Sequence, residues 1–134
     1  ASNANYQVIN RADCDGQIEI AMPTMKQMLK ETPDVDVVMA LNDRSALGAL
    51  AAIESMEIDN VLVYGVDGSP DVKELINTGL IQATAAQSPV KMGQLAYQKA
   101  KALLENKKIE KKIEVPVELI SRDNISNFEL TGWQ

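Results

Sequence analysis

The chain has 134 residues, which is enough for one domain and short for two, and its 46% hydrophobic and 24% charged residues are those of an ordinary folded protein. A formal net charge of -6 argues against a nucleic-acid-binding surface, because such surfaces depend on clustered Lys and Arg. The sequence has no histidine and one cysteine, so the commonest metal ligand and general base is missing, and we expect neither a metal site nor a cofactor.

The first predicted element is a strand over residues 6–12 (YQVINRA), followed by a turn at residues 13–16 (DCDG). The turn matches the middle of a calcium-binding EF-hand loop, D-x-D-G-x-I. Arg11 stands where the first carboxylate ligand should be and Met22 where the bidentate glutamate should be, so we reject a calcium site. Residues 18–32 then carry apolar side chains three and four positions apart, which predicts a helix with one face toward a sheet.

Three further strands are predicted from short apolar segments, and a polar side chain marks the end of each. They are residues 35–41, followed by Asn42, residues 61–67, ending in Asp67, and residues 81–86, followed by Gln87. Helices are predicted after these strands, over residues 45–56, 71–78 and 90–106. A last strand is predicted over residues 115–121, where Pro116 indicates a sheet edge or a connection, and a tail of mixed polarity follows.

This alternation predicts an α/β fold: a mostly parallel sheet with helices on both faces, joined by right-handed crossovers, in three αβα layers of the flavodoxin-like or Rossmann-like kind. Asn42, Asp67 and Gln87 would then meet at the carboxyl edge of the sheet, where such folds bind ligands. One carboxylate and two amides suit a ligand rich in hydroxyl groups. For a lone aspartate the plainer interpretation, a cap on the following turn, is equally good. The repetition of the pattern favours a ligand site.

The chain resembles a known family in three segments, VMALNDRSALGALAAI, VLVYGVDGSPDVKELINTGLIQATAAQSPVKMGQLAYQKA and VPVELISRDNI. They are similar to the carboxyl-terminal half of the type I periplasmic sugar-binding proteins of ABC transporters, the ribose-binding group in particular, over about residues 6–127. In that family the Asn of the N-D pair, the Asp of G-x-D-G and the Gln of the A-Q-x-P stretch hydrogen-bond the sugar hydroxyls. The resemblance therefore implies ligand-binding roles for Asn42, Asp67 and Gln87.

The same resemblance adds Asp13 and Cys14 to the expected ligand-binding residues. They lie in the stretch that corresponds to the family's A-D-x-D-R motif, which reads A-D-C-D-G here. Family members usually carry an aromatic residue inside this motif, which stacks on the sugar ring. Here Cys14 and Gly16 offer neither the ring nor the arginine, so the chain departs from the pattern for pyranose recognition, which implies a different ligand or stacking from the other lobe only.

The resemblance also implies a fragment, because members of this family have two lobes joined by a hinge. Residues 1–134 would be a single domain from such a protein, with residues 6–87 as the core of the second lobe. Residues 88–134 would be a helix, a strand and a tail that return toward the hinge and the first lobe. An interior strand of the lobe would be missing. Since exposed strand edges are poorly tolerated, we expect the sheet to be closed by repacking or by a second copy, as a homodimer or by exchange of elements.

For function, the resemblance implies a non-enzymatic solute-binding component of an ABC transporter. Its ligand would be a sugar, its partner a membrane permease, and its location extracytoplasmic. The effector-binding core of a LacI-type transcription regulator shares the fold and is the alternative, and the two differ in whether a signal peptide or a DNA-binding segment precedes the core. A third interpretation, an enzyme or phosphate-accepting receiver with Asp43 or Asp67 as nucleophile, has little support, since the sequence shows no phosphate-binding loop and no histidine.

Overall fold

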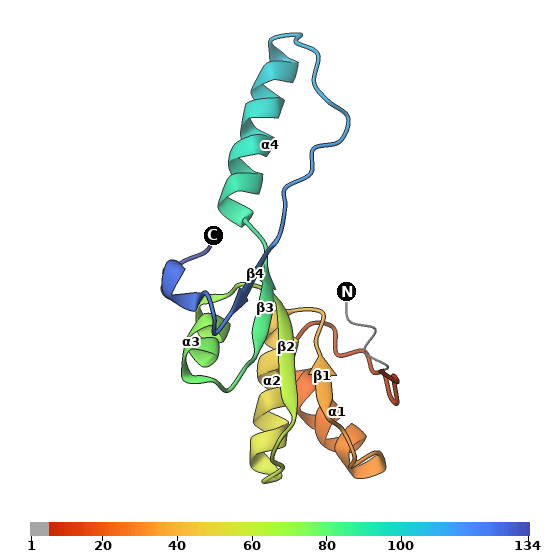
Figure 1. The fold of residues 1–134 in the computed structure, drawn as a ribbon. Coiled ribbons are helices and arrows are strands. Elements are labelled where there is room, and N and C mark those ends of the chain that lie inside the picture. Colours follow the sequence, from red (N-terminus) through yellow and green to blue (C-terminus); the bar gives the residue numbers. More distant parts are fainter. Residues whose placement is uncertain (1–5) are drawn as a thin grey trace.

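The computed structural model describes residues 6–134 as a mostly parallel sheet with helices (Figure 1). In chain order the elements are α1 (Ile18–Glu31), β1 (Val37–Met39), α2 (Asp43–Ser55), β2 (Leu62–Asp67), α3 (Pro70–Thr78), β3 (Ala83–Ala86), α4 (Pro89–Leu104), β4 (Glu118–Ser121) and the short 3-10 helix η1 (Ile125–Asn127). The strands lie side by side in the order β1-β2-β3-β4. β1, β2 and β3 are parallel, and β4 is antiparallel to β3. The predicted α/β class with a mostly parallel sheet is confirmed.

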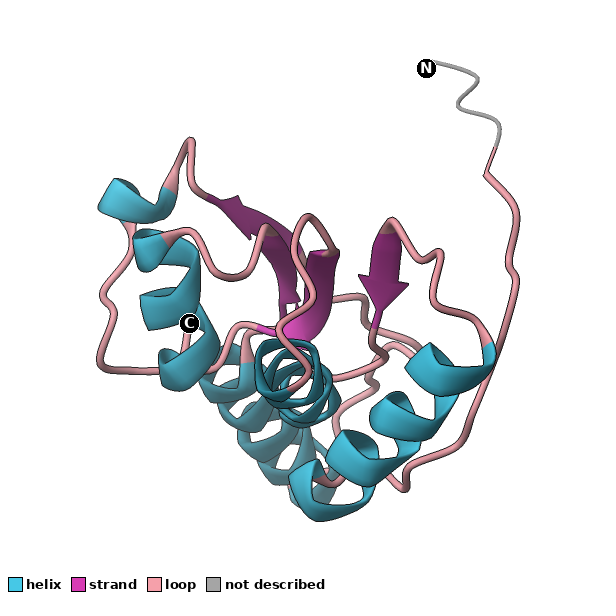
Figure 2. Cartoon of the chain, turned by 90° about the horizontal axis from the view of Figure 1, so that it is seen from below, coloured by secondary structure: helices cyan, strands magenta, loops and turns pink. Residues whose placement is uncertain are grey.

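Helices cover one face of this sheet (Figure 2). Val63, Thr84 and Ile120 point to the covered face and are fully buried. On the opposite face several large apolar side chains are exposed, namely Val37, Met39, Leu62 and Leu119. The second helical layer that the alternation predicted is therefore absent from residues 6–134. The strand order explains this difference, because right-handed crossovers that step in one direction, from β1 to β2 to β3, place α2 and α3 on the same face.

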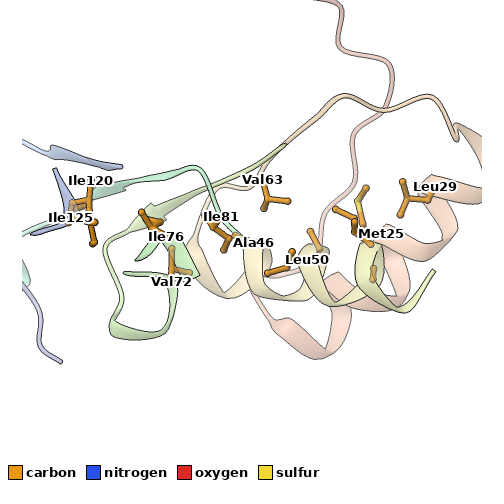
Figure 3. Close-up of a cluster of buried hydrophobic side chains, with 14 residues drawn as sticks. Met25, Leu29, Ala46, Leu50, Val63, Val72, Ile76, Ile81, Ile120 and Ile125 are labelled. Carbon is orange, nitrogen blue, oxygen red and sulfur yellow. The ribbon is translucent and has the colours of Figure 1, made fainter. Parts of the chain in front are cut away.

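The hydrophobic core lies between the sheet and the helices α1, α2 and α3. Figure 3 shows it as a continuous row of side chains, from Met25 and Leu29 on α1, past Leu50 on α2 and Val63 on β2, to Ile120 on β4. The helical residues among them, Met25, Leu29 and Leu50, match the apolar faces that the helical periodicity predicted. The core thereby fixes the positions of β1, β2 and β3 relative to one another, and with them the residues that follow each strand.

The strand predicted over residues 6–12 is wrong. This segment is extended chain with no partner in the sheet, and Tyr6, Val8 and Ile9 are exposed, Tyr6 to 87%. A strand needs a neighbour that accepts and donates its backbone hydrogen bonds, and the edge strand β1 pairs with β2 and not with this segment. Instead the segment is held through a side-chain hydrogen bond of 3.4 Å from Asn10 Nδ2 to Thr32 Oγ1.

Helix α4 extends away from the sheet, and residues 105–117 return beside it to β4 (Figure 1). None of its side chains is buried. Its more apolar face, with Met92, Leu95 and Ala96, borders a shallow groove against Ile109 and Ile113 of the returning segment. Among residues 6–134, no helix combines the length and apolar character needed to cross a membrane.

The C-terminal tail packs on α3 through Lys73. This lysine is fully buried, and its Nζ donates hydrogen bonds to the backbone carbonyls of Glu129 and Gly132. Burial of the ammonium group lowers the pKa of Lys73, while the nearby Glu129 carboxylate acts in the opposite direction. The tail is thus attached to α3 through its carbonyl groups, and its Phe128 and Leu130 also pack against the hydrophobic core.

Candidate functional site

The carboxyl edge of the parallel strands brings together the three polar residues predicted from the strand ends. Asn42 follows β1, Asp67 ends β2 and Gln87 follows β3, and because the three strands are parallel and adjacent, these residues share one edge. All three are half-buried, so each keeps some contact with solvent. This arrangement is what the sequence pattern predicted.

Asp67 and Gln87 are in direct contact. Gln87 Nε2 donates a hydrogen bond of 2.7 Å to Asp67 Oδ1, and the backbone N–H of Gln87 donates one of 3.0 Å to the carbonyl of Asp67. The side-chain bond uses one oxygen of the carboxylate and one N–H of the amide. The second oxygen of Asp67 and the amide oxygen of Gln87 are left as acceptors. The pair can therefore accept hydrogen bonds from the hydroxyl groups of a ligand.

Asn42 also stabilises the local structure. Its Oδ1 accepts a hydrogen bond of 2.8 Å from the N–H of Ser45, which caps α2, and its Nδ2 donates one of 3.1 Å to the carbonyl of Gly16. Gly16 has a positive φ of 64°, and a Cβ on it would come 2.6 Å from Asn42 Nδ2. The side chain of Asn42 thus joins the turn at residues 13–16 to α2, with one N–H left for a ligand.

The structure places Cys14 and Asp13 differently. Cys14 is half-buried, and its Sγ lies 3.2 Å from Ser45 Oγ, at the start of α2 beside the Asn42 cap. Cys14 is therefore near the strand-end residues. Asp13 is exposed, and its Oδ1 accepts a hydrogen bond of 3.0 Å from the N–H of Asp15 within its own turn. A contact between Asp13 and Asn42, Asp67 or Gln87 is not among the hydrogen bonds of residues 6–134.

Sequence reasoning considered Asp43 as a nucleophile in the enzyme interpretation and missed its place among the strand-end residues. Its side chain is 1% exposed and accepts two hydrogen bonds, from Thr84 Oγ1 to Oδ1 at 2.8 Å and from the N–H of Ser69 to Oδ2 at 2.6 Å. Burial raises the pKa of Asp43, and the neighbouring Asp67 carboxylate adds to the rise, whereas the hydrogen bonds from Ser69 and Thr84 oppose it. The sequence signal was Thr84, a polar residue in the middle of an apolar strand.

The described residues offer no cluster that resembles a metal centre. Within residues 6–134, no group of three or more Cys, Asp and Glu side chains is arranged to hold a metal ion. What the sheet edge does offer is a set of hydrogen-bonding groups, one carboxylate and two amides, at the ends of adjacent strands. This chemistry suits binding of a neutral polar molecule through its hydroxyl groups.

Comparison with known proteins gives a family match and close relatives. The family described as periplasmic binding protein domain matches residues 1–108. The ribose import binding protein of Bacillus subtilis is 38% identical over 118 residues, which cover 88% of this chain and 38% of that protein. The chain therefore spans well under half of the length of this relative.

Solved structures agree with the family match. An ABC transporter periplasmic solute binding protein from Actinobacillus succinogenes, with bound D-allose, superposes with a TM-score of 0.88 at 25% identity, over 91% of this chain and 44% of that one. The myo-inositol binding protein of Caulobacter, bound to myo-inositol, superposes with a TM-score of 0.85 at 25% identity, over 91% of this chain and 43% of that one. The chain therefore has the fold of part of these proteins.

Proposed function

Because the chain belongs to the periplasmic binding protein domain family, we propose that it is part of the solute-binding component of a sugar ABC transporter and binds its ligand without transforming it. The observation that carries this proposal is the contact between Asp67 and Gln87 at the ends of β2 and β3. It orients a carboxylate and an amide side by side, with acceptors left over. One relative named above is a ribose import binding protein, and the two solved structures hold D-allose and myo-inositol. These relatives support a ligand of the same class.

The proposed ligand is a small polyhydroxylated molecule, and its binding residues are Asn42, Asp67 and Gln87, with Cys14 and Asp13 at the rim. Hydroxyl groups donate to the free acceptors of Asp67 and Gln87 and accept from the remaining N–H of Asn42. A site that hydrogen-bonds hydroxyl groups discriminates strongly against analogues that lack them. Because Cys14 provides no aromatic face, these residues recognise the ligand through hydrogen bonds to its hydroxyl groups, and ring stacking would come from the other lobe only.

In the whole protein the proposal includes closure of two lobes around the solute, a membrane permease as partner and an extracytoplasmic location. The family description, which names periplasmic proteins, supports the location. Closure adds contacts from a second surface, so a single lobe is expected to bind weakly. We expect a dissociation constant in the millimolar range or weaker for the 134-residue chain, about -4 kcal/mol or less.

The test is a titration of the isotope-labelled chain with pentoses, hexoses and cyclitols, followed by NMR. We expect saturable amide shifts near Asn42, Asp67 and Gln87 for one class of ligand. Asp67→Ala should abolish these shifts, whereas Asp71→Ala, which removes an exposed carboxylate from the first turn of α3, should leave them unchanged. No response to any polyol, from a sample with a well-dispersed spectrum, would contradict the proposal.

Two other predictions bear on the whole protein. The LacI-type alternative gains no support from the family match or from the relatives named above, which are binding proteins. Association with a second copy stays a prediction, for which the exposed apolar sheet face, with Val37, Met39, Leu62 and Leu119, is a surface that a copy would cover. A strictly monomeric mass in sedimentation at high micromolar concentration would contradict it.

A further inference from the structure

Asp43 connects three elements at the proposed ligand site. It is the first residue of α2, it accepts the hydroxyl of Thr84 on β3, and it accepts the N–H of Ser69, which caps α3. A negative charge in the first turn of a helix is favourable, because the exposed N–H groups there carry partial positive charge. The carboxylate is nevertheless 1% exposed, so both of its hydrogen bonds are needed to offset the loss of water.

The two hydrogen bonds act on the turn that contains Asp67. Thr84 Oγ1 donates to Asp43 and accepts a hydrogen bond of 3.2 Å from the N–H of Gly68. Ser69 is the next residue, and its N–H donates to Asp43 directly. The two consecutive N–H groups after Asp67 are therefore both anchored, one to Asp43 and one to a hydroxyl that Asp43 orients. Such a pair of bonds fixes the peptide planes on the carboxyl side of Asp67.

Asp67 needs this support, because its φ is 129°. Non-glycine residues rarely adopt a positive φ of this size, and the conformation persists only where surrounding contacts impose it. In this conformation the carboxylate of Asp67 receives the side-chain amide of Gln87. The strained residue of the turn is thus also the residue that carries the proposed site.

Gly65 leaves space for the side chain of Asp43. A Cβ on Gly65 would overlap Oδ1 of Asp43, with the Cβ of Ala46 and the Cα of Asp43 also close by. The absence of a side chain two residues before Asp67 therefore lets the carboxylate lie directly against β2 and accept the N–H of Ser69, which follows that strand in the chain. Any larger residue there would displace it.

From these contacts we propose that Asp43 is a positioning residue of the ligand site: its buried carboxylate holds the turn at residues 67–69 so that Asp67 faces Gln87. This positioning role rests on the proposed function for one point only, namely that Asp67 binds a ligand. A purely structural role for Asp43 would affect the stability of the chain and the N–H of Ser69. A positioning role also affects Gln87, which has no hydrogen bond to Asp43.

The test uses the isotope-labelled 134-residue chain without ligand. In Asp43→Asn an N–H₂ group replaces one of the two acceptors and the negative charge is lost, so the bond from Ser69 becomes a neutral one or breaks, and the Thr84 hydroxyl must reorient if the N–H₂ group faces it. We expect the N–H of Ser69 to exchange with solvent about tenfold faster or more, since a charge-assisted bond to a buried carboxylate is lost. The side-chain amide signals of Gln87 should move toward those of a free amide. Asp71→Asn, an equal change of charge in the first turn of α3, should alter neither.

Thr84→Val is the second variant and serves if Asp43→Asn does not fold. It keeps the shape of the side chain and removes the hydroxyl that links Gly68 to Asp43. It should release the N–H of Gly68 and move the Gln87 signals in the same direction. Faster exchange at Ser69 or Gly68 with unchanged Gln87 signals in both variants would overturn the proposal.

Addition of the polyol panel to wild type separates this inference from the proposed function. If wild type binds a polyol, Asp43→Asn should bind it about tenfold more weakly, the loss expected for one misplaced hydrogen-bonding group. If wild type binds none, the proposed function fails, while displaced Gln87 signals in the free variants still support the positioning link. If the variants bind as wild type does, Asp43 does not position the site.

Discussion

The side-chain amide of Gln87 donates a 2.7 Å hydrogen bond to the carboxylate of Asp67, which joins the carboxyl ends of β3 and β2. This contact determines the orientation of the Asp67 carboxylate. One oxygen of Asp67 is held by the protein, so the orientation of the other is fixed in the free chain, and less side-chain freedom would be lost on binding the proposed ligand.

The positive φ of Asp67 predicts that glycine is a better replacement there than alanine. Both Asp67→Gly and Asp67→Ala remove the carboxylate and should abolish polyol-induced shifts. Glycine adopts a φ of 129° without strain and alanine does not, so the glycine variant should be more stable by about 1 kcal/mol. Urea unfolding followed by circular dichroism measures the difference. Equal stability of the two variants would show that the backbone at this position is not strained.

The buried carboxylate of Asp43 predicts how stability depends on pH. Burial raises its pKa above the ordinary value of 3.8, so the folded chain keeps this proton to a higher pH than the unfolded chain does. Its contribution to the free energy of unfolding is therefore fully present below 3.8 and is lost as the pH rises through the folded-state pKa.

Asp43→Asn removes this titration, so the stability of wild type relative to the variant should fall as the pH rises. Urea midpoints measured from about pH 3 to pH 7 give the slope. Asp71→Asn is the control and should not reproduce it, because that carboxylate is exposed. A difference that rises with pH would contradict the assignment of burial as the dominant cause.

The close approach of α1 and α2 predicts that Gly48→Ala is destabilising. A Cβ on Gly48 would lie 2.6 Å from the Cβ of Ala21 and 2.9 Å from the carbonyl oxygen of Ile18. Alanine is normally the better helix former by about 1 kcal/mol, but here the overlap should outweigh that gain and cost about 1–3 kcal/mol. Gly93→Ala in α4 is the matched control, since nothing lies within 4 Å of a Cβ there. It should be neutral or stabilising in the same unfolding measurement.

The buried ammonium group of Lys73 predicts that Lys73→Met releases the C-terminal tail. Methionine keeps much of the apolar stem, but the carbonyls of Glu129 and Gly132 lose their donor, which should weaken docking of the tail by about 1–3 kcal/mol. Trp133 is half-exposed and reports the change through a red shift of its fluorescence. Lys91→Met, at an exposed position of α4, should leave the emission unchanged. An unshifted spectrum in Lys73→Met would show that other contacts hold the tail.

The strand ends were predictable from the sequence because their signal is local. A short apolar run followed by a polar residue identifies the end of a buried strand, and parallel neighbours bring such ends together. Asn42, Asp67 and Gln87 accordingly lie at one edge of the sheet. The same pattern could not assign different roles to Asn42 and to the adjacent Asp43. Its burial depends on Thr84, which lies 41 residues away, and on the space left by Gly65.

The structure of residues 6–12 and the packing of α4 depend on which segments lie beside them, and a local sequence pattern does not show this. The segment at residues 6–12 has the composition of a strand, but a strand forms only where another strand completes its hydrogen bonds. The apolar periodicity of α4 predicted a helix with one apolar side, and the helix is present. The pattern could not tell that this side borders residues 109–115 rather than the sheet.

The order of the strands also sets a sequence of events for folding. The loop that closes β4 against β3 is about twice as long as the one that closes β3 against β2, which adds about 0.6 kcal/mol of closure entropy. Helix α4 lies in that loop and buries no side chain, so it recovers little of this cost before β4 arrives. The three parallel strands should therefore condense with α1, α2 and α3 first. β4 should add last, and the amide of Ile120 should gain protection after that of Val63 during refolding.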